Sequence, residues 1–319
     1  MEKIELRKAR DFGQLFNDSI AFLRVNFKSF FGTIVFLAGP FVMLTGLLAG
    51  FLQYVSMQLS FSNRLNGIGP ANIFSGNSVS TLCIYGIIFL LTTLVTNASV
   101  ALYFKLYDQT ATQDLPIQRN AISPLLAAAS WRLFYNLLLL GIVMSVFSLA
   151  LVAVFYVLGQ AGVFNVIIGL TVFVAFIIFI PPLTYTLIIA NFIVIRDEIL
   201  ITAAIGKAWR YMRGSFWQTW ILIFCVIFSL SMLYMIFNAP TMILTVVNTF
   251  TRRSAEAQSL SSATNNSLWY MAFGALSTLG GMLVISPILT CFCVFNFYNH
   301  EERHEGTSLL SRIDTFDKN

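Results

Sequence analysis

The chain has 319 residues, of which 57% are hydrophobic and only 10% are charged, and its formal net charge is +5. This balance lies outside the range of soluble globular domains and indicates a polytopic helical membrane protein. The positive charge does not indicate a nucleic-acid partner, because the cations lie beside long apolar segments, as they do in membrane proteins of defined topology.

The amino-terminal part predicts a short charged lead followed by an amphipathic helix. Apolar residues recur at steps of three and four between Phe12 and Phe30, and polar residues that include Arg24 and Lys28 occupy the rest of the helical wheel. This pattern predicts an interfacial helix over about 12–29, with its apolar side in lipid. The first span should then follow at about 30–55 and the second, after a polar loop, at about 79–104.

Two further interfacial helices are expected in front of later spans. Ser123 and Pro124 form a good helix start, which predicts a helix over 123–131. The third covers 198–213, where three cations spaced three apart share one side and apolar residues the other. The remaining four spans are expected at about 131–158, 165–195, 216–248 and 268–299.

The distribution of lysine and arginine predicts the orientation in the membrane. With these six spans, sixteen of the 19 cations fall on one side and three, Arg64, Arg252 and Arg253, on the other. Positive charge marks the cytoplasmic side, so both termini are expected in the cytoplasm of a bacterial cell, with the protein in its cytoplasmic membrane. We expect one transmembrane domain over 1–299 and a cytoplasmic tail over 300–319.

Two internal matches suggest that the chain is built from repeated helix hairpins. Residues 22–33 resemble residues 208–219, with Arg24 aligned to Arg210. Residues 182–198 resemble residues 287–302, and in both segments an asparagine follows the first proline by nine residues. Apolar segments with aromatic borders also resemble one another through composition alone. If the repeat is real, the fold is all-α, with six transmembrane helices in three hairpins, each preceded by a cytoplasmic interfacial helix.

The order of residues around the third interfacial helix resembles a known group of membrane domains. Glu198, Trp209, Arg213 with Gly214, and Phe216 with Trp217 follow one another as in the membrane domains attached to some bacterial glycerophosphodiester phosphodiesterases and in related stand-alone six-span proteins of unassigned function. The tail, with Glu305 and Gly306 ahead of Leu309 and Arg312, is similar to the ending of that group. The resemblance implies the six-helix fold. It implies no phosphodiesterase activity, because the sequence contains no catalytic domain of that kind.

His300, Glu301 and His304 match the H-E-x-x-H motif of zinc proteases. On a helix this spacing places two imidazoles on one face, where they bind zinc while the glutamate acts as general base. The chain has no other histidine. A third ligand would therefore be a carboxylate such as Asp197, Glu198 or Asp314. The alternative is a solvated segment next to the membrane, which the charged residues at the two variable positions favour.

Polar residues inside the apolar segments suggest a second kind of site. Asn191 and Asn296, with helices interrupted near Pro182 and Pro287, are candidates for lining a cavity that holds a neutral or lipid-like molecule. The alternative is hydrogen bonding between helices. The cations of the interfacial helices are expected to contact anionic lipid headgroups; they are Arg24, Lys28, Lys207, Arg210 and Arg213.

Together these features favour a non-enzymatic membrane subunit or scaffold. It is expected to need no cofactor and to hold other membrane or cytoplasmic proteins through its cytoplasmic helices and tail. A carrier of lipid-like or neutral small molecules is the alternative, and a zinc-dependent membrane hydrolase is a minor one.

Overall fold

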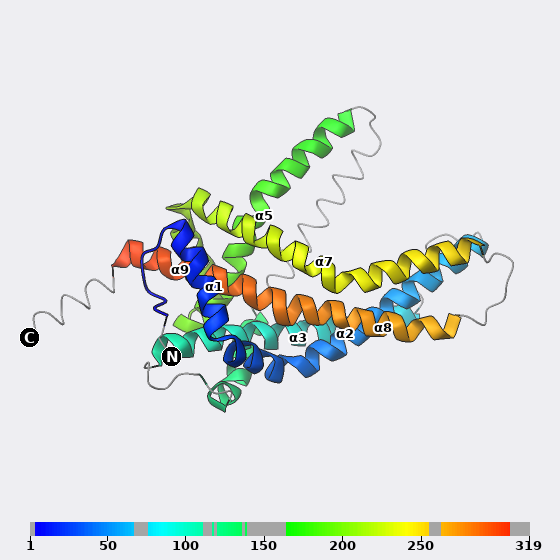
Figure 1. Ribbon diagram of the computed structural model, residues 1–319, viewed down its shortest axis with the longest axis horizontal. Helices are drawn as coiled ribbons and strands as arrows, with labels where there is room; N and C mark the ends of the chain where they lie inside the picture. Colours follow the sequence, from blue (N-terminus) through cyan, green and yellow to red (C-terminus); the bar gives the residue numbers. More distant parts are fainter. Residues whose placement is uncertain are drawn as a thin grey trace, which may run out of the picture. The chain divides into compact units, whose positions relative to one another are not determined.

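The structure, a computed structural model, describes residues 4–66, 76–110, 117, 120–135, 138, 164–254 and 263–306 (Figure 1). Within these ranges it contains eight bounded α-helices, one π-helix and no strand, and residues 120–135 are helical as well. The all-α class predicted from the sequence is therefore confirmed.

The described elements have the following bounds. In chain order they are α1 Phe12–Val25, α2 Phe27–Asn66, α3 Gly76–Gln109, α5 Phe164–Asp197, α6 Ile201–Arg213, α7 Phe216–Ser254, α8 Ala263–Leu279, the π-helix η4 Gly280–Ile285 and α9 Ser286–Glu305.

Five helical segments are long and apolar enough to cross a membrane. They are Phe27–Ser56, Cys83–Gln109, Ile178–Asp197, Phe216–Asn248 and Ser267–Glu305. They correspond to the first, second, fourth, fifth and sixth spans predicted from the sequence, and they indicate a multi-pass membrane protein. The predicted third span, at about 131–158, lies almost entirely outside the described residues.

The first amphipathic segment is two helices rather than one. Asp11 caps α1 by accepting a hydrogen bond from the backbone N–H of Gln14 at 2.7 Å, and Gln14 accepts one from the N–H of Asp11 at 3.4 Å. The helix stops at Asn26, whose side-chain amide bonds back to the carbonyl of Phe22 at 3.2 Å. The prediction of one helix over 12–29 is therefore wrong at its end: α1 ends at Val25, and α2 begins at Phe27.

The third amphipathic segment begins later than predicted. Glu198, at the end of α5, has φ +59, a left-handed conformation that stops a helix and is uncommon for a residue other than glycine. Helix α6 starts at Ile201, and Gly214 with Ser215 separates it from α7. The chain therefore passes from α5 to α7 through α6.

The prolines do not interrupt the apolar helices where the sequence suggested. Helix α5 runs unbroken from Phe164 to Asp197 through Pro182, so the predicted interruption there is wrong. Pro287, which has no N–H to donate, is the second residue of α9 and follows η4 without a break in the helix. The irregular backbone comes just before it, in η4, where the N–H of Ser286 bonds to the carbonyl of Gly281, five residues back.

The contacts divide the chain into two compact units. The first unit contains Met1–Phe30, Val100–Phe228 and Ile288–Asn319, and the second contains Phe31–Ser99 and Ser229–Pro287. An aromatic cluster forms the core of the first unit. Phe22 lies at its centre, stacked on Phe104 with ring centroids 5.1 Å apart and in edge contact with Tyr107 at 5.0 Å and Phe295 at 5.5 Å.

In the second unit α2 and α8 approach each other through glycine. A Cβ at Gly50 would lie 2.1 Å from the carbonyl oxygen of Tyr270, and one at Gly46 would lie 2.5 Å from the Cα of Ala275. Such contacts require small residues, as is common where membrane helices cross closely. Hydroxyl groups add a link between α2 and α3, where Thr45 and Thr92 are 2.6 Å apart.

Candidate functional site

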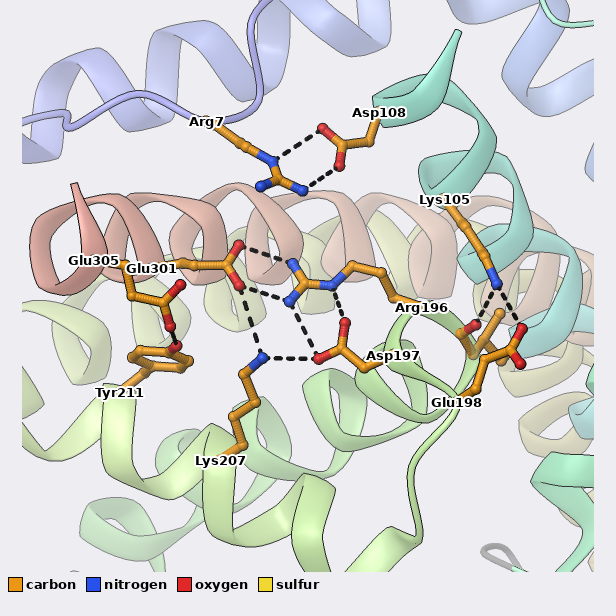
Figure 2. A network of polar contacts seen from close by, with 11 residues as sticks. Arg7, Lys105, Asp108, Arg196, Asp197, Glu198, Lys207, Tyr211, Glu301 and Glu305 are labelled. Atoms are coloured by element: carbon orange, nitrogen blue, oxygen red, sulfur yellow. Dashed lines mark hydrogen bonds and ion pairs between the residues drawn. The ribbon is translucent and has the colours of Figure 1, made fainter. Parts of the chain in front are cut away.

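The most heavily charged part of the first unit is centred on Arg196, in the last turn of α5. Its guanidinium donates two hydrogen bonds to Glu301 of α9, at 2.6 and 2.8 Å, and a third to Asp197 at 2.6 Å (Figure 2). The side chains of Arg196 and Glu301 are only 10% and 6% exposed. Two parallel N–H bonds from one guanidinium to one carboxylate fix the orientation of both groups.

Lys207 joins this cluster from α6. Its ammonium lies 2.8 Å from Asp197 and 3.9 Å from Glu301. Figure 2 shows the lysine pointing toward the two carboxylates. The sequence predicted a headgroup contact for Lys207 together with Arg210 and Arg213, but in the structure only those two arginines are exposed. The network therefore takes one cation out of the predicted basic face.

Aromatic rings surround the guanidinium of Arg196. The rings of Phe297, Tyr298 and Phe192 have their centroids 4.8, 5.4 and 5.8 Å from its central carbon. A cation over an aromatic face is stabilised by the ring quadrupole, most strongly where water is excluded. The rings therefore stabilise the buried cation along with the carboxylates.

The contacts between α5 and α9 follow the internal sequence match. That match aligns residues 105 positions apart, and Arg196 and Glu301 are separated by that number. Phe192 and Phe297 have the same separation in sequence, and their ring centroids are 6.0 Å apart. Contact between equivalent positions is what a local two-fold relation between two helix ends produces. The two matched segments therefore meet at aligned positions.

A second ionic group surrounds Glu198. Its carboxylate lies 3.1 Å from the ammonium of Lys105 in α3 and 3.0 Å from the guanidinium of Arg132 in the helical segment 120–135. The hydrogen bonds from Arg132 and Lys105 lower the pKa of Glu198 to about 2. Lys105 also donates to the carbonyl of Ile195 at 2.9 Å. These contacts join three parts of the first unit.

The segment before α1 is attached through two arginines. Arg10 is buried, bonds to Asp18 at 2.7 Å and donates to backbone carbonyls within residues 5–8. Its backbone N–H donates to the side chain of Asn299 at 2.7 Å, and its carbonyl accepts from Arg303. The second arginine, Arg7, pairs with Asp108 at 2.8 Å, and that hydrogen bond raises the pKa of Arg7.

The first half of the HEERH motif is buried rather than solvated. Helix α9 continues to Glu305, and His300 and Glu301 are 1% and 4% exposed. His300 shares a hydrogen bond of 2.9 Å with the hydroxyl of Thr219, while His304 packs against the ring of Tyr211, with centroids 5.7 Å apart. The predicted solvated setting is therefore wrong for the first half of the motif.

The carboxylates considered for zinc chemistry are engaged elsewhere. Glu301, the general base of the zinc hypothesis, accepts from Arg196, while Asp197 and Glu198 bind their own cations. The third candidate ligand, Asp314, lies outside the described residues. In the described part of the chain no group of three or more His, Cys, Asp or Glu side chains is arranged to hold a metal ion.

Asn296 belongs to a buried polar chain rather than to a cavity between prolines. Its amide donates to Thr219 at 3.2 Å, and Thr219 in turn contacts His300. Of the other residues proposed for that cavity, Asn191 is half-buried, Pro182 is buried in the first unit, and Pro287 falls in the second. The side chains of Asn296 and Tyr185 lie close enough to interact, and apart from that contact the oxygen of Asn296 and the hydroxyl of Tyr185 have no hydrogen-bond partner among the described atoms.

Two contacts of the first unit could not be predicted from a pattern within any one segment of the sequence. Tyr211 of α6 donates to Glu305 of α9, which fixes the short helix to the last one. Burial, followed by this hydrogen bond, raises the pKa of Tyr211. In the sequence Arg10 looks like any other charged residue of the segment before α1. Its partner outside that segment, Asn299, is 289 residues away, so no local pattern predicts the contact.

Comparisons of the chain with protein-family models, with curated proteins and with solved structures found no match. The function is therefore inferred from the geometry of the site itself.

Proposed function

We propose that the chain is a non-enzymatic scaffold or subunit of a complex in a bacterial cytoplasmic membrane. The observation that carries the proposal is the ionic network of the first unit. It connects the segment before α1 to α3, and it connects residues 120–135, α5, α6 and α9 to one another. Charged groups paired in this way fix the geometry of helix ends, which is what a docking platform requires.

The proposed membrane topology has six spans in three hairpins, with both termini in the cytoplasm. Five candidate spans and the apolar sequence at about 131–158 support this number. The short helices α1 and α6 each precede an apolar helix, as the repeat requires. The resemblance to the membrane domains of bacterial glycerophosphodiester phosphodiesterases agrees with this arrangement and remains part of the proposal.

Cysteine labelling tests the topology. In a chain whose four native cysteines are replaced by alanine, we would introduce Arg213→Cys or Arg253→Cys, which lie before and near the end of α7. A membrane-impermeant maleimide added to intact spheroplasts should label Cys only in the Arg253 variant. Labelling of the Arg213 variant should require permeabilisation. Equal labelling of both variants from outside would contradict the proposed orientation.

Native mass spectrometry of the full chain, extracted in its own lipids, tests the scaffold function. A stoichiometric protein partner is expected, and the chain lacking residues 307–319 serves to ask whether the tail contributes. The variant Arg196→Gln serves as a second comparison, because loosening the network should weaken the complex. A chain that never carries a partner, although it is folded and in its native membrane, would refute the proposal.

A carrier of small neutral molecules is a second candidate, favoured by one specific observation. The buried oxygen of Asn296 and the buried hydroxyl of Tyr185 lie beside each other, and apart from that contact neither has a hydrogen-bond partner among the described protein atoms. A molecule that co-purifies with the wild type and is lost from Asn296→Leu would support this reading. The control is Asn97→Leu, because the amide of Asn97 bonds within its own helix, to Thr93 at 2.9 Å.

A further inference from the structure

The lysine and arginine residues whose side chains the structure describes fall into two classes. Seven are held by carboxylates, backbone carbonyls or a side-chain amide within the protein: Arg7, Arg10, Lys105, Arg132, Arg196, Lys207 and Arg303. Five are exposed and pair with no described carboxylate: Lys8, Arg24, Lys28, Arg210 and Arg213. The second class is therefore available to a partner of negative charge.

Four of these five exposed cations lie at two helix junctions. Arg24 and Lys28 flank the α1–α2 junction at Asn26, and Arg210 and Arg213 precede the α6–α7 junction. Both junctions lead directly into a candidate membrane span, which starts at Phe27 in one case and at Phe216 in the other. By chain continuity these cations lie within about two helical turns of an apolar segment.

The α6–α7 junction also exposes two tryptophans. Trp209 precedes Arg210 and is 49% exposed, and Trp217, in the first turn of α7, is 66% exposed. Tryptophan is enriched at the level of lipid headgroups, because its ring is apolar and its N–H is polar. The opposite side of α6 is packed within the protein through Ala204 and Ala208, so the helix presents its outer side in a fixed orientation.

We propose that the α6–α7 junction binds an anionic phospholipid, with Arg210 and Arg213 on the headgroup phosphate and Trp209 and Trp217 beside the upper acyl chains. The two arginines favour an anion, and their position next to the apolar helix α7 favours an anion that belongs to a lipid over a soluble one. Lys207 takes no part, because its half-buried ammonium is paired with Asp197 at 2.8 Å. The inference rests on the membrane placement of the proposed function, and it does not depend on a protein partner.

Fluorescence quenching tests this site. The full chain carrying Trp131→Phe, Trp220→Phe and Trp269→Phe keeps only the two junction tryptophans as reporters. In detergent it is titrated with brominated phosphatidylglycerol or brominated phosphatidylcholine. We expect phosphatidylglycerol to quench at lower concentration, and Arg210→Gln with Arg213→Gln to weaken its apparent affinity about thirtyfold, about fivefold for each cation.

Arg24→Gln with Lys28→Gln is the matched control. It removes the same net charge at the repeat-related α1–α2 junction and should leave the quenching of Trp209 and Trp217 unchanged. All four substituted side chains are exposed, so the unfolding temperature should stay at the wild-type value. Equal quenching by both lipids, or equal loss in both double variants, would overturn the inference. Loss of a co-purifying protein instead of lipid would overturn it too, by assigning the arginines to a protein partner.

The two proposals fail separately. If native mass spectrometry finds no protein partner while selective quenching by phosphatidylglycerol persists, the scaffold function is refuted and the lipid site stands. If a partner is found and the quenching is not selective, the reverse holds.

Discussion

From the ion pair between Arg196 and Glu301 we expect that removing the cation lowers the free energy of unfolding more than removing the anion does. When Glu301 becomes glutamine, Arg196 keeps Asp197 at 2.6 Å and its aromatic neighbours. The amide oxygen that replaces the carboxylate still accepts one N–H. The loss is then that of one charged hydrogen bond, about 2 kcal/mol.

The change Arg196→Gln leaves two carboxylates with too little positive charge. Asp197 and Glu301 remain with Lys207 as their nearest cation, which lies 2.8 Å from the first and 3.9 Å from the second. Breaking a buried pair so that one charge stays uncompensated costs about 3–5 kcal/mol. We therefore expect a loss of about 4 kcal/mol, roughly twice that of Glu301→Gln.

The double variant Arg196→Gln with Glu301→Gln should be less destabilised than the sum of the two single variants. It leaves Lys207 and Asp197 as a simple pair at 2.8 Å. Unfolding by SDS in mixed micelles, followed by circular dichroism, gives the three free energies and hence the coupling between the residues. Additive losses, or a larger loss for Glu301→Gln than for Arg196→Gln, would refute the reasoning.

Three further predictions concern other contacts. Gly50→Ala should destabilise by about 1–3 kcal/mol, because its Cβ meets the carbonyl of Tyr270, while Gly32→Ala, with open space in the same helix, should be neutral or slightly stabilising in the same SDS titration. Pairing with Arg132 and Lys105 lowers the pKa of Glu198 from 4.5 to about 2, so the contribution of Glu198 to folding stability is complete above pH 4.5 and is lost as the pH falls toward 2. Glu198→Gln should therefore remove this part of the acid-induced fall in unfolding temperature. Tyr211→Phe should cost about 1 kcal/mol through its lost hydrogen bond to Glu305, and an unchanged SDS midpoint would contradict the importance of that bond.

The helices themselves were predictable because the chemistry of a span is local. About twenty consecutive apolar residues suffice to define one, and five of the six predicted spans correspond to helices of the described chain. The junctions were less predictable. The stop at Asn26 depends on one side chain bonding back to Phe22, and the stop at Glu198 depends on a left-handed residue held by Lys105 and Arg132. Neither periodicity nor composition contains that information.

Some contacts of the ionic network could have been predicted from the sequence, and others could not. Arg10 and Asn299 are 289 residues apart, and no pattern within either segment connects them. The sequence match between residues 182–198 and 287–302, by contrast, did contain a usable signal for Arg196 and Glu301. These opposite charges occupy aligned positions of two matching segments, and aligned positions meet when two such helix ends pack side by side. A repeat is therefore also a hypothesis about contacts, which its aligned charges make testable.

The HEERH motif shows what helical spacing decides and what it leaves to the neighbouring helices. Residues four apart in α9 do share one face, as the zinc hypothesis requires. Yet that face crosses two different neighbours: His300 meets Thr219 of α7, whereas His304 meets Tyr211 of α6. Between them, Glu301 meets the guanidinium of Arg196 at 2.6 Å, and this paired carboxylate is a poor base for activating water. The same three side chains that would form a metal site around an open groove attach α9 to three other helices in this protein, because α5, α6 and α7 supply a cation, a ring and a hydroxyl to the face of α9.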